Sequence, residues 1–160
     1  MDKHEKLISL LEDFNNAMLV TRTSAGELDA RPMAIADVEE NGTLWFVSDR
    51  NSGKIADLML DQDVAVTMQS SNKFVSVTGK CQAVEDRQKV DDLWNEAFKV
   101  WFPEGKSDPS IILLRIDPAR GEYWDNSGLQ GIKYLVKAGK AYWQGERPTP
   151  DASINAAVTM

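Results

Sequence analysis

Three residues of the chain have side chains that suit a phosphate group. Arg31 lies on a predicted strand, and an arginine that points inward from a strand needs an anionic partner. Ser52 and Lys54 lie where a predicted strand ends and a short helix begins. The free N–H groups of a helix N-terminus favour bound anions. Together, Arg31, Ser52 and Lys54 predict a phosphate clamp.

Each of these three residues also has an ordinary structural explanation. Arg31 is equally compatible with a solvated strand position, Ser52 with a helix N-cap and Lys54 with a surface charge. Capping serines and exposed cations are the usual cases. The spacing alone therefore leaves both interpretations open.

Aromatic residues supply a second candidate surface. Trp101 and Phe102 precede a Pro-Glu-Gly turn at the predicted end of a helix, and Trp124 falls at the end of a predicted strand. Large flat side chains at a rim favour contact with a planar ligand. Trp94 and Phe98, by contrast, lie on the apolar stripe of their predicted helix and are expected in the core.

Metal and nucleophilic chemistry have little support in the sequence. The chain has one cysteine, Cys81, and one histidine, His4, which lies near the N-terminus. Neither belongs to a metal-ligand spacing or a triad order. Redox chemistry in this chain would therefore depend on a bound cofactor.

Composition indicates one folded domain, expected over residues 1–145 and followed by a polar tail at 146–160. Eighteen basic against twenty-five acidic residues give a formal charge of −7, which disfavours binding to nucleic acid. The alternative function of a small β-barrel that binds nucleic acid is disfavoured for the same reason. No apolar run approaches the length of about 20 residues that a membrane span needs. We expect a cytoplasmic protein without nucleic-acid or membrane partners.

The elements that must position these residues are mostly strands. Hydrophobic periodicity predicts helices over 3–15, 53–60 and 87–100, with weaker helical spacing at 131–142. Pro118 is expected to interrupt the sixth strand segment. The predicted strands are 18–21, 28–36, 44–48, 64–68, 74–79, 111–116 and 121–124. This pattern predicts a mainly β protein with peripheral helices, a six- to seven-stranded antiparallel barrel.

An ordered set of short motifs resembles the pyridoxamine 5′-phosphate oxidase-like flavoproteins, and within them the bacterial general stress protein branch. The motifs begin with Leu19-Val20-Thr21 and continue through the segments 31–33, 44–48, 52–54, 63–66, 75–79, 93–105 and 122–125. The resemblance covers about Leu7 to Asp125. It implies a split β-barrel homodimer that holds two FMN molecules at the subunit interface.

The resemblance also implies roles for individual residues. The phosphate-binding arginine of the family falls on Arg31, and Ser52 and Lys54 match its second phosphate-binding element. The strand after Arg31 would run under the flavin, and Trp124 matches a tryptophan brought by the partner subunit. The remaining cofactor-binding residues that it implies are Pro32, Met33, Ala34, Val47, Ser48, Trp101 and Phe102.

One departure from the family pattern limits the function that it implies. The oxidases that act on vitamin B6 carry an Arg-x-His-Asp-Arg-type segment after the tryptophan, whereas here Trp124 is followed by Asp125-Asn126-Ser127-Gly128. This argues against pyridoxamine 5′-phosphate oxidase activity. We expect an FMN-dependent oxidoreductase that uses NAD(P)H or another small redox partner. The alternative is a non-catalytic flavin-binding or flavin-sensing stress protein.

Overall fold

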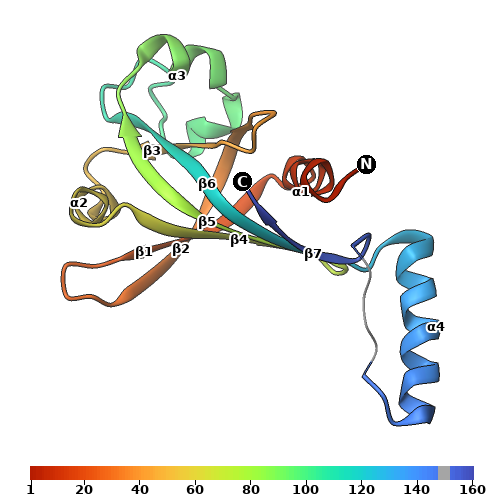
Figure 1. Ribbon diagram of the computed structural model, residues 1–160. Coiled ribbons are helices and arrows are strands. Elements are labelled where there is room, and N and C mark those ends of the chain that lie inside the picture. Colours follow the sequence, from red (N-terminus) through yellow and green to blue (C-terminus); the bar gives the residue numbers. More distant parts are fainter. Residues whose placement is uncertain (148–151) are drawn as a thin grey trace.

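The strands form one antiparallel sheet that closes into a barrel, as the sequence predicts. The computed structural model describes residues 1–147 and 152–160. Six strands run in the order β3-β2-β1-β4-β5-β6, and β3 pairs with β6 to close the barrel (Figure 1). Their bounds are β1 (Asn16–Arg22), β2 (Leu28–Val38), β3 (Leu44–Asp49), β4 (Asp63–Gln69), β5 (Lys73–Val84) and β6 (Ile111–Asp125).

The sixth strand is continuous through Pro118, so the predicted interruption there is wrong. Proline has no N–H to donate, and the pairing of β5 with β6 shifts register between Thr78 and Gly79, opposite this proline. A Cβ atom on Gly79 would lie 2.1 Å from the Asp117 carbonyl oxygen. The strand passes the proline because a glycine lets the neighbouring backbone come close.

The C-terminal part of the chain adds one strand and one long helix. Strand β7 (Asn155–Thr159) pairs with the second half of β6, and the sequence does not predict it within the expected tail at 146–160. Of that tail, 148–151 lie outside the described residues. Helix α4 (Gly128–Gln144) confirms the helical spacing at 131–142 and extends away from the barrel (Figure 1).

Two helices pack against the barrel and complete its core. Helix α1 (Lys3–Glu12) buries Leu7, Leu10 and Leu11, and α2 (Gly53–Leu60) connects β3 to β4 and buries Leu58. Burial of such side chains is the main favourable contribution to folding. In the described part of the chain, no helix combines the length and the apolar character needed to cross a membrane.

The predicted helix over 87–100 is two shorter helices. Helix α3 (Arg87–Leu93) ends at Trp94, whose backbone is not helical, and the 3-10 helix η1 (Glu96–Val100) follows. The Asn95 side chain accepts a hydrogen bond from the Ala97 N–H at 2.9 Å and caps η1. Because asparagine favours a cap over a helix interior, it divides the segment and turns η1 in a new direction.

Candidate functional site

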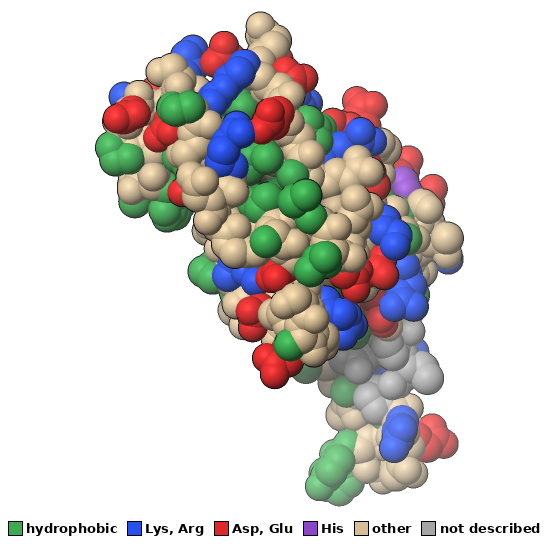
Figure 2. Space-filling model, turned by 90° about the vertical axis from the view of Figure 1, so that its left-hand side faces the viewer, with side chains coloured by type: hydrophobic (Ala, Val, Ile, Leu, Met, Phe, Trp, Pro, Cys, Tyr) green, Lys and Arg blue, Asp and Glu red, His purple; other side chains and the backbone are tan. Residues whose placement is uncertain are grey.

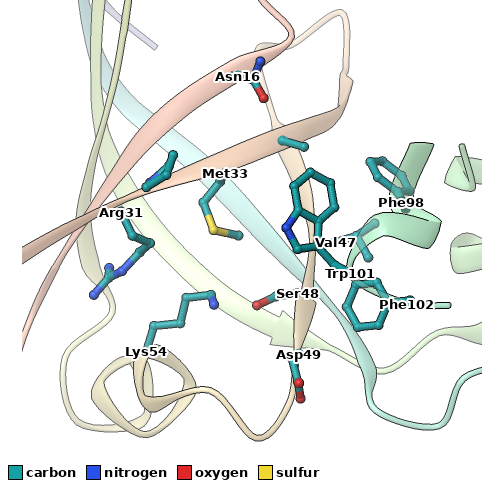
Figure 3. Close-up of a pocket in the computed structure, with 12 residues that line it drawn as sticks. Asn16, Arg31, Met33, Val47, Ser48, Asp49, Lys54, Phe98, Trp101 and Phe102 are labelled. Carbon is teal, nitrogen blue, oxygen red and sulfur yellow. The ribbon is translucent and has the colours of Figure 1, made fainter.

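A cavity of about 380 Å³ opens between the barrel and η1. Strands β2 and β3 form one wall, the start of α2 closes one end, and η1 with the turn after it lies opposite (Figure 3). Its volume lies within the range of small-molecule sites. The lining residues are Asn16, Arg31, Pro32, Met33, Ala34, Val47, Ser48, Asp49, Lys54, Phe98, Trp101 and Phe102.

Two cations lie at one end of this cavity. The Arg31 guanidinium donates to Thr21 Oγ1 at 2.7 Å and to the Leu19 carbonyl at 3.3 Å, which orients it from β2. Lys54 Nζ, at the start of α2, lies 3.0 Å from Ser52 Oγ. Among the described residues, neither cation has a carboxylate within ion-pair distance.

The surroundings of Lys54 disfavour its own positive charge. Burial lowers the pKa of Lys54 below its ordinary value, the nearby Arg31 lowers it further, and Asp49 acts in the opposite direction. A bound anion would compensate both unfavourable effects. This end of the cavity therefore has the charge and the donors of an anion-binding site.

Aromatic side chains lie across the cavity from the cations. Phe98, Trp101 and Phe102 extend from η1 and the residues after it, and Met33 lies between them and the cations (Figure 3). Phe102 is buried in a small cluster with Trp45, whereas Trp101 keeps 62% of its surface exposed. The cavity thus joins a cationic end to an apolar and aromatic surface, a combination that fits a flat ligand with an anionic group.

One buried hydroxyl at the cavity has no hydrogen-bond partner within the described chain. Ser48, near the end of β3, is only 4% exposed, and its Oγ is unpaired. Buried polar atoms are nearly always paired, because an unpaired one costs about 1–3 kcal/mol. Since Ser48 lines the cavity, a ligand with polar atoms can supply the missing partner.

Nine of the eleven predicted site residues line the cavity, and two do not. Ser52 is absent from the lining, makes no side-chain capping bond to α2 and instead contacts Lys54. Trp124 lies on β6 opposite Phe74 of β5, with 38% of its surface exposed, and is not part of the cavity. The chain alone therefore brings together the predicted cations and strand residues but leaves Trp124 outside.

Three lining residues were not in the predicted set: Asn16, Asp49 and Phe98. Phe98 was expected in the core, and it is indeed 6% exposed while it also lines the cavity. Its placement depends on the break at Asn95, which turns η1 toward β2 and β3. A capping asparagine inside an apolar stripe is the one signal that would have indicated this break.

Comparison with known proteins identifies relatives of the chain. Residues 2–149 match the family model described as pyridoxamine 5′-phosphate oxidase like. Protein bli-3 of Neurospora crassa is 30% identical over 133 residues, which cover 76% of this chain and 64% of that protein. The chain thus spans less than two thirds of the length of this relative.

Solved structures share the fold. A putative general stress protein 26 from Jannaschia sp. CCS1 has a TM-score of 0.71 and 24% identity over 97% of this chain and 96% of its own. A protein described as a general stress FMN/FAD binding protein, from Xanthomonas citri, has a TM-score of 0.66 and 30% identity over 78% of this chain and 89% of its own. The general stress protein 26 of Bacillus anthracis has a TM-score of 0.69 and 24% identity over 77% and 94%.

Proposed function

The chain belongs to the pyridoxamine 5′-phosphate oxidase-like family, and from this premise we propose that it is an FMN-binding oxidoreductase of the general stress type. The name of the Xanthomonas citri relative, an FMN/FAD binding protein, supports a flavin as the ligand. We specify FMN because the two cations at the cavity match a terminal phosphate. Oxidation of vitamin B6 is not proposed, since the segment after Trp124 departs from that of the oxidases.

The observation that carries this proposal is the pair Arg31 and Lys54, which share one end of the cavity without a carboxylate partner in the described chain. Arginine and lysine donors form charge-assisted hydrogen bonds with phosphate oxygens. The opposite side is apolar, as a flavin ring requires. Ser48 supplies a hydroxyl for a polar atom between these regions.

A bound flavin supplies the electron or hydride transfer, and the side chains of this protein have supporting roles. Arg31 and Lys54 hold the phosphate. Met33 and Val47 present an apolar wall on the barrel side. Trp101 and Phe102 restrict the access of water from the side of η1.

We further propose that the protein acts as a homodimer in which the partner subunit completes the site. Two features support this proposal. Trp124 lies outside the cavity of its own chain, and with Phe74 it forms an exposed aromatic pair on the outer surface of β5 and β6. Apolar side chains also gather on the face of the molecule shown in Figure 2. Exposed aromatic surface of this kind is typical of protein interfaces.

Native mass spectrometry of the purified full chain, with and without added FMN, tests binding and assembly together. We expect a dimer that carries two FMN molecules. A chain that is purified without flavin and takes up no added FMN would contradict the proposed function. Stopped-flow mixing of the FMN complex with NADH or NADPH then tests catalysis. Rapid flavin reduction is expected, whereas an inert bound flavin would favour the flavin-sensing alternative.

A further inference from the structure

Helix α4 presents an apolar face whose side chains remain largely exposed in the described structure. Side chains on this face keep between 56% and 88% of their surface exposed. Figure 1 shows the helix extending away from the barrel, and Figure 2 shows exposed apolar side chains at this end of the molecule. The helical spacing aligns Leu129, Ile132, Val136 and Trp143 on one side, with Leu135 and Tyr142 beside them.

This helix is weak by itself. Its N-cap residue, Ser127, makes no side-chain capping bond, and Gly131 and Gly139 lie inside the helix. Both features lower intrinsic helix stability. In proteins, most of the stability of a helix comes from the packing of its amphipathic face. The exposed face of α4 therefore needs a partner surface.

The start of α4 is held close to the end of β6. A Cβ atom on Gly131 would lie 1.9 Å from the Asn126 carbonyl oxygen, so the first turn packs closely on the end of β6. The preceding residue Ser127 donates its N–H to Asp125 at 3.0 Å, and Asp125 is also paired with Lys6 of α1. Beyond α4 the chain returns to pair β7 with β6. The residues directly before α4 and strand β7 after it are therefore both attached to the barrel.

The charge of α4 indicates what covers it. Its sequence contains three lysines and no acidic residue. The rest of the chain then holds fifteen basic and twenty-five acidic residues, a formal charge of −10. Lys133 and Lys140 lie one turn from Leu129 and Val136, at the edge of the apolar face. An anionic membrane would attract three lysines but repel the acidic barrel. An acidic protein surface, such as the barrel of a second copy, suits α4 better.

We propose that α4 is a docking arm that packs its apolar face on a second copy of this chain. Its root lies beside Phe74 and Trp124, the exposed pair that we placed in the dimer interface. The arm extends this apolar surface from the barrel along the partner. The inference deepens the proposed dimer and rests on it, but it does not depend on flavin binding.

Sedimentation equilibrium of full-length variants tests the arm. Ile132→Glu and Val136→Glu each place a charge on the apolar face, and Gln144→Glu adds the same charge to an exposed position of the same helix that lies off that face. We expect the dimer dissociation constant to rise at least about tenfold in the first two variants and to change less than about twofold in the third. Circular dichroism checks that α4 remains helical in each.

The possible results separate the arm from the dimer and from the flavin site. If Ile132→Glu and Val136→Glu leave the dimer dissociation constant unchanged, the proposed docking arm is wrong, but the proposed dimer stands. A chain that is monomeric at all concentrations overturns both. If the two variants weaken the dimer as expected but the protein does not bind FMN, the result supports the docking arm and contradicts the proposed function. The wild type could instead bind phosphatidylserine vesicles. If Ile132→Glu abolishes that binding and leaves the dimers unaffected, the apolar face is a membrane-binding surface.

A labelling experiment keeps the inference testable if a glutamate variant fails to fold. The only cysteine, Cys81, is buried, so a cysteine introduced on α4 takes up a thiol dye selectively. A polarity-sensitive dye on Leu135→Cys should shift its emission to the blue as the protein concentration passes the dimer dissociation constant. The same dye on Gln144→Cys should not shift. Equal emission from Leu135→Cys at all concentrations, while dimers form, contradicts the arm.

Discussion

Arg31 and Lys54 are the residues on which ligand affinity should depend most. Each charge-assisted hydrogen bond to a phosphate contributes about 1.5–3 kcal/mol. Lys54→Ala should therefore weaken FMN binding by about 10- to 100-fold, and the double variant with Arg31→Ala should weaken it further. Flavin fluorescence titration measures both.

Two controls distinguish phosphate binding from a general loss of structure. Lys106→Ala removes an exposed lysine outside the cavity and should leave FMN affinity unchanged. Riboflavin lacks the phosphate, so its affinity should be nearly the same in the wild type and in Lys54→Ala. Equal losses of affinity for FMN and riboflavin would contradict the clamp.

Cys81 should be unreactive in the folded protein. Burial, together with the nearby Asp117, raises the pKa of this thiol to about 12. Because the thiolate is the reactive form, only about one molecule in ten thousand is reactive at pH 8. An aromatic disulfide reagent at pH 8 should label Cys81 slowly in the native state and rapidly in urea. Rapid labelling of the native protein would mean that the barrel core opens readily at β5.

At the scale of single residues, the sequence predicts those site residues whose role follows from their own side chain and their immediate neighbours. An arginine on a strand and a lysine at a helix start are visible in the sequence, and both line the cavity. Asn16 and Asp49 have no such local signal, because they reach the cavity only through the pairing of β1 with β2 and through the end of β3. Trp124 lies outside the cavity of its own chain, so its proposed contact with the flavin would require a second subunit.

At the scale of elements, the passage of β6 across Pro118 depends on Gly79. Gly79→Ala should destabilise the protein by about 1–3 kcal/mol or more, because the new methyl group would overlap the Asp117 carbonyl of the adjacent strand. Gly53→Ala is a matched control: its Cβ would meet no atom within 4 Å, and it lies at the first position of α2. Urea denaturation compares the two. Equal stability of Gly79→Ala and wild type would contradict the close packing at the register shift.

The segments around Pro118 and over 87–100 show why some element boundaries could not be predicted from the sequence. Proline usually ends a strand, yet β6 continues because a register shift on its neighbour accommodates Pro118. The apolar stripe over 87–100 is typical of one helix, yet the cap at Asn95 divides it. At Pro118 the close packing of the neighbouring strand at Gly79 decides the outcome, whereas at Asn95 the local cap decides it. Strand β7 has only five residues and lacks a clear apolar alternation, so its pairing with β6 defines it.

At the scale of the whole molecule, the barrel brings the cavity together from strands, a helix start and η1, but one side stays open to whatever adjoins the chain. If FMN binds there against the partner subunit, flavin binding and dimerisation are thermodynamically linked. Any ligand that binds the dimer more tightly than the monomer must strengthen the dimer by a corresponding factor. The flavin and the interface then stabilise each other.

This linkage yields a prediction for the intact protein. Saturating FMN should lower the dimer dissociation constant by about 5- to 150-fold, the usual range of such coupling. Sedimentation equilibrium with and without FMN measures it, and Arg31→Ala with Lys54→Ala should reduce the effect at the same FMN concentration because less flavin is bound. A dissociation constant that does not respond to FMN, although FMN binds, would mean that the cofactor lies wholly within one subunit. Trp124 would then have no part in the site, since it lies outside the cavity of its own chain.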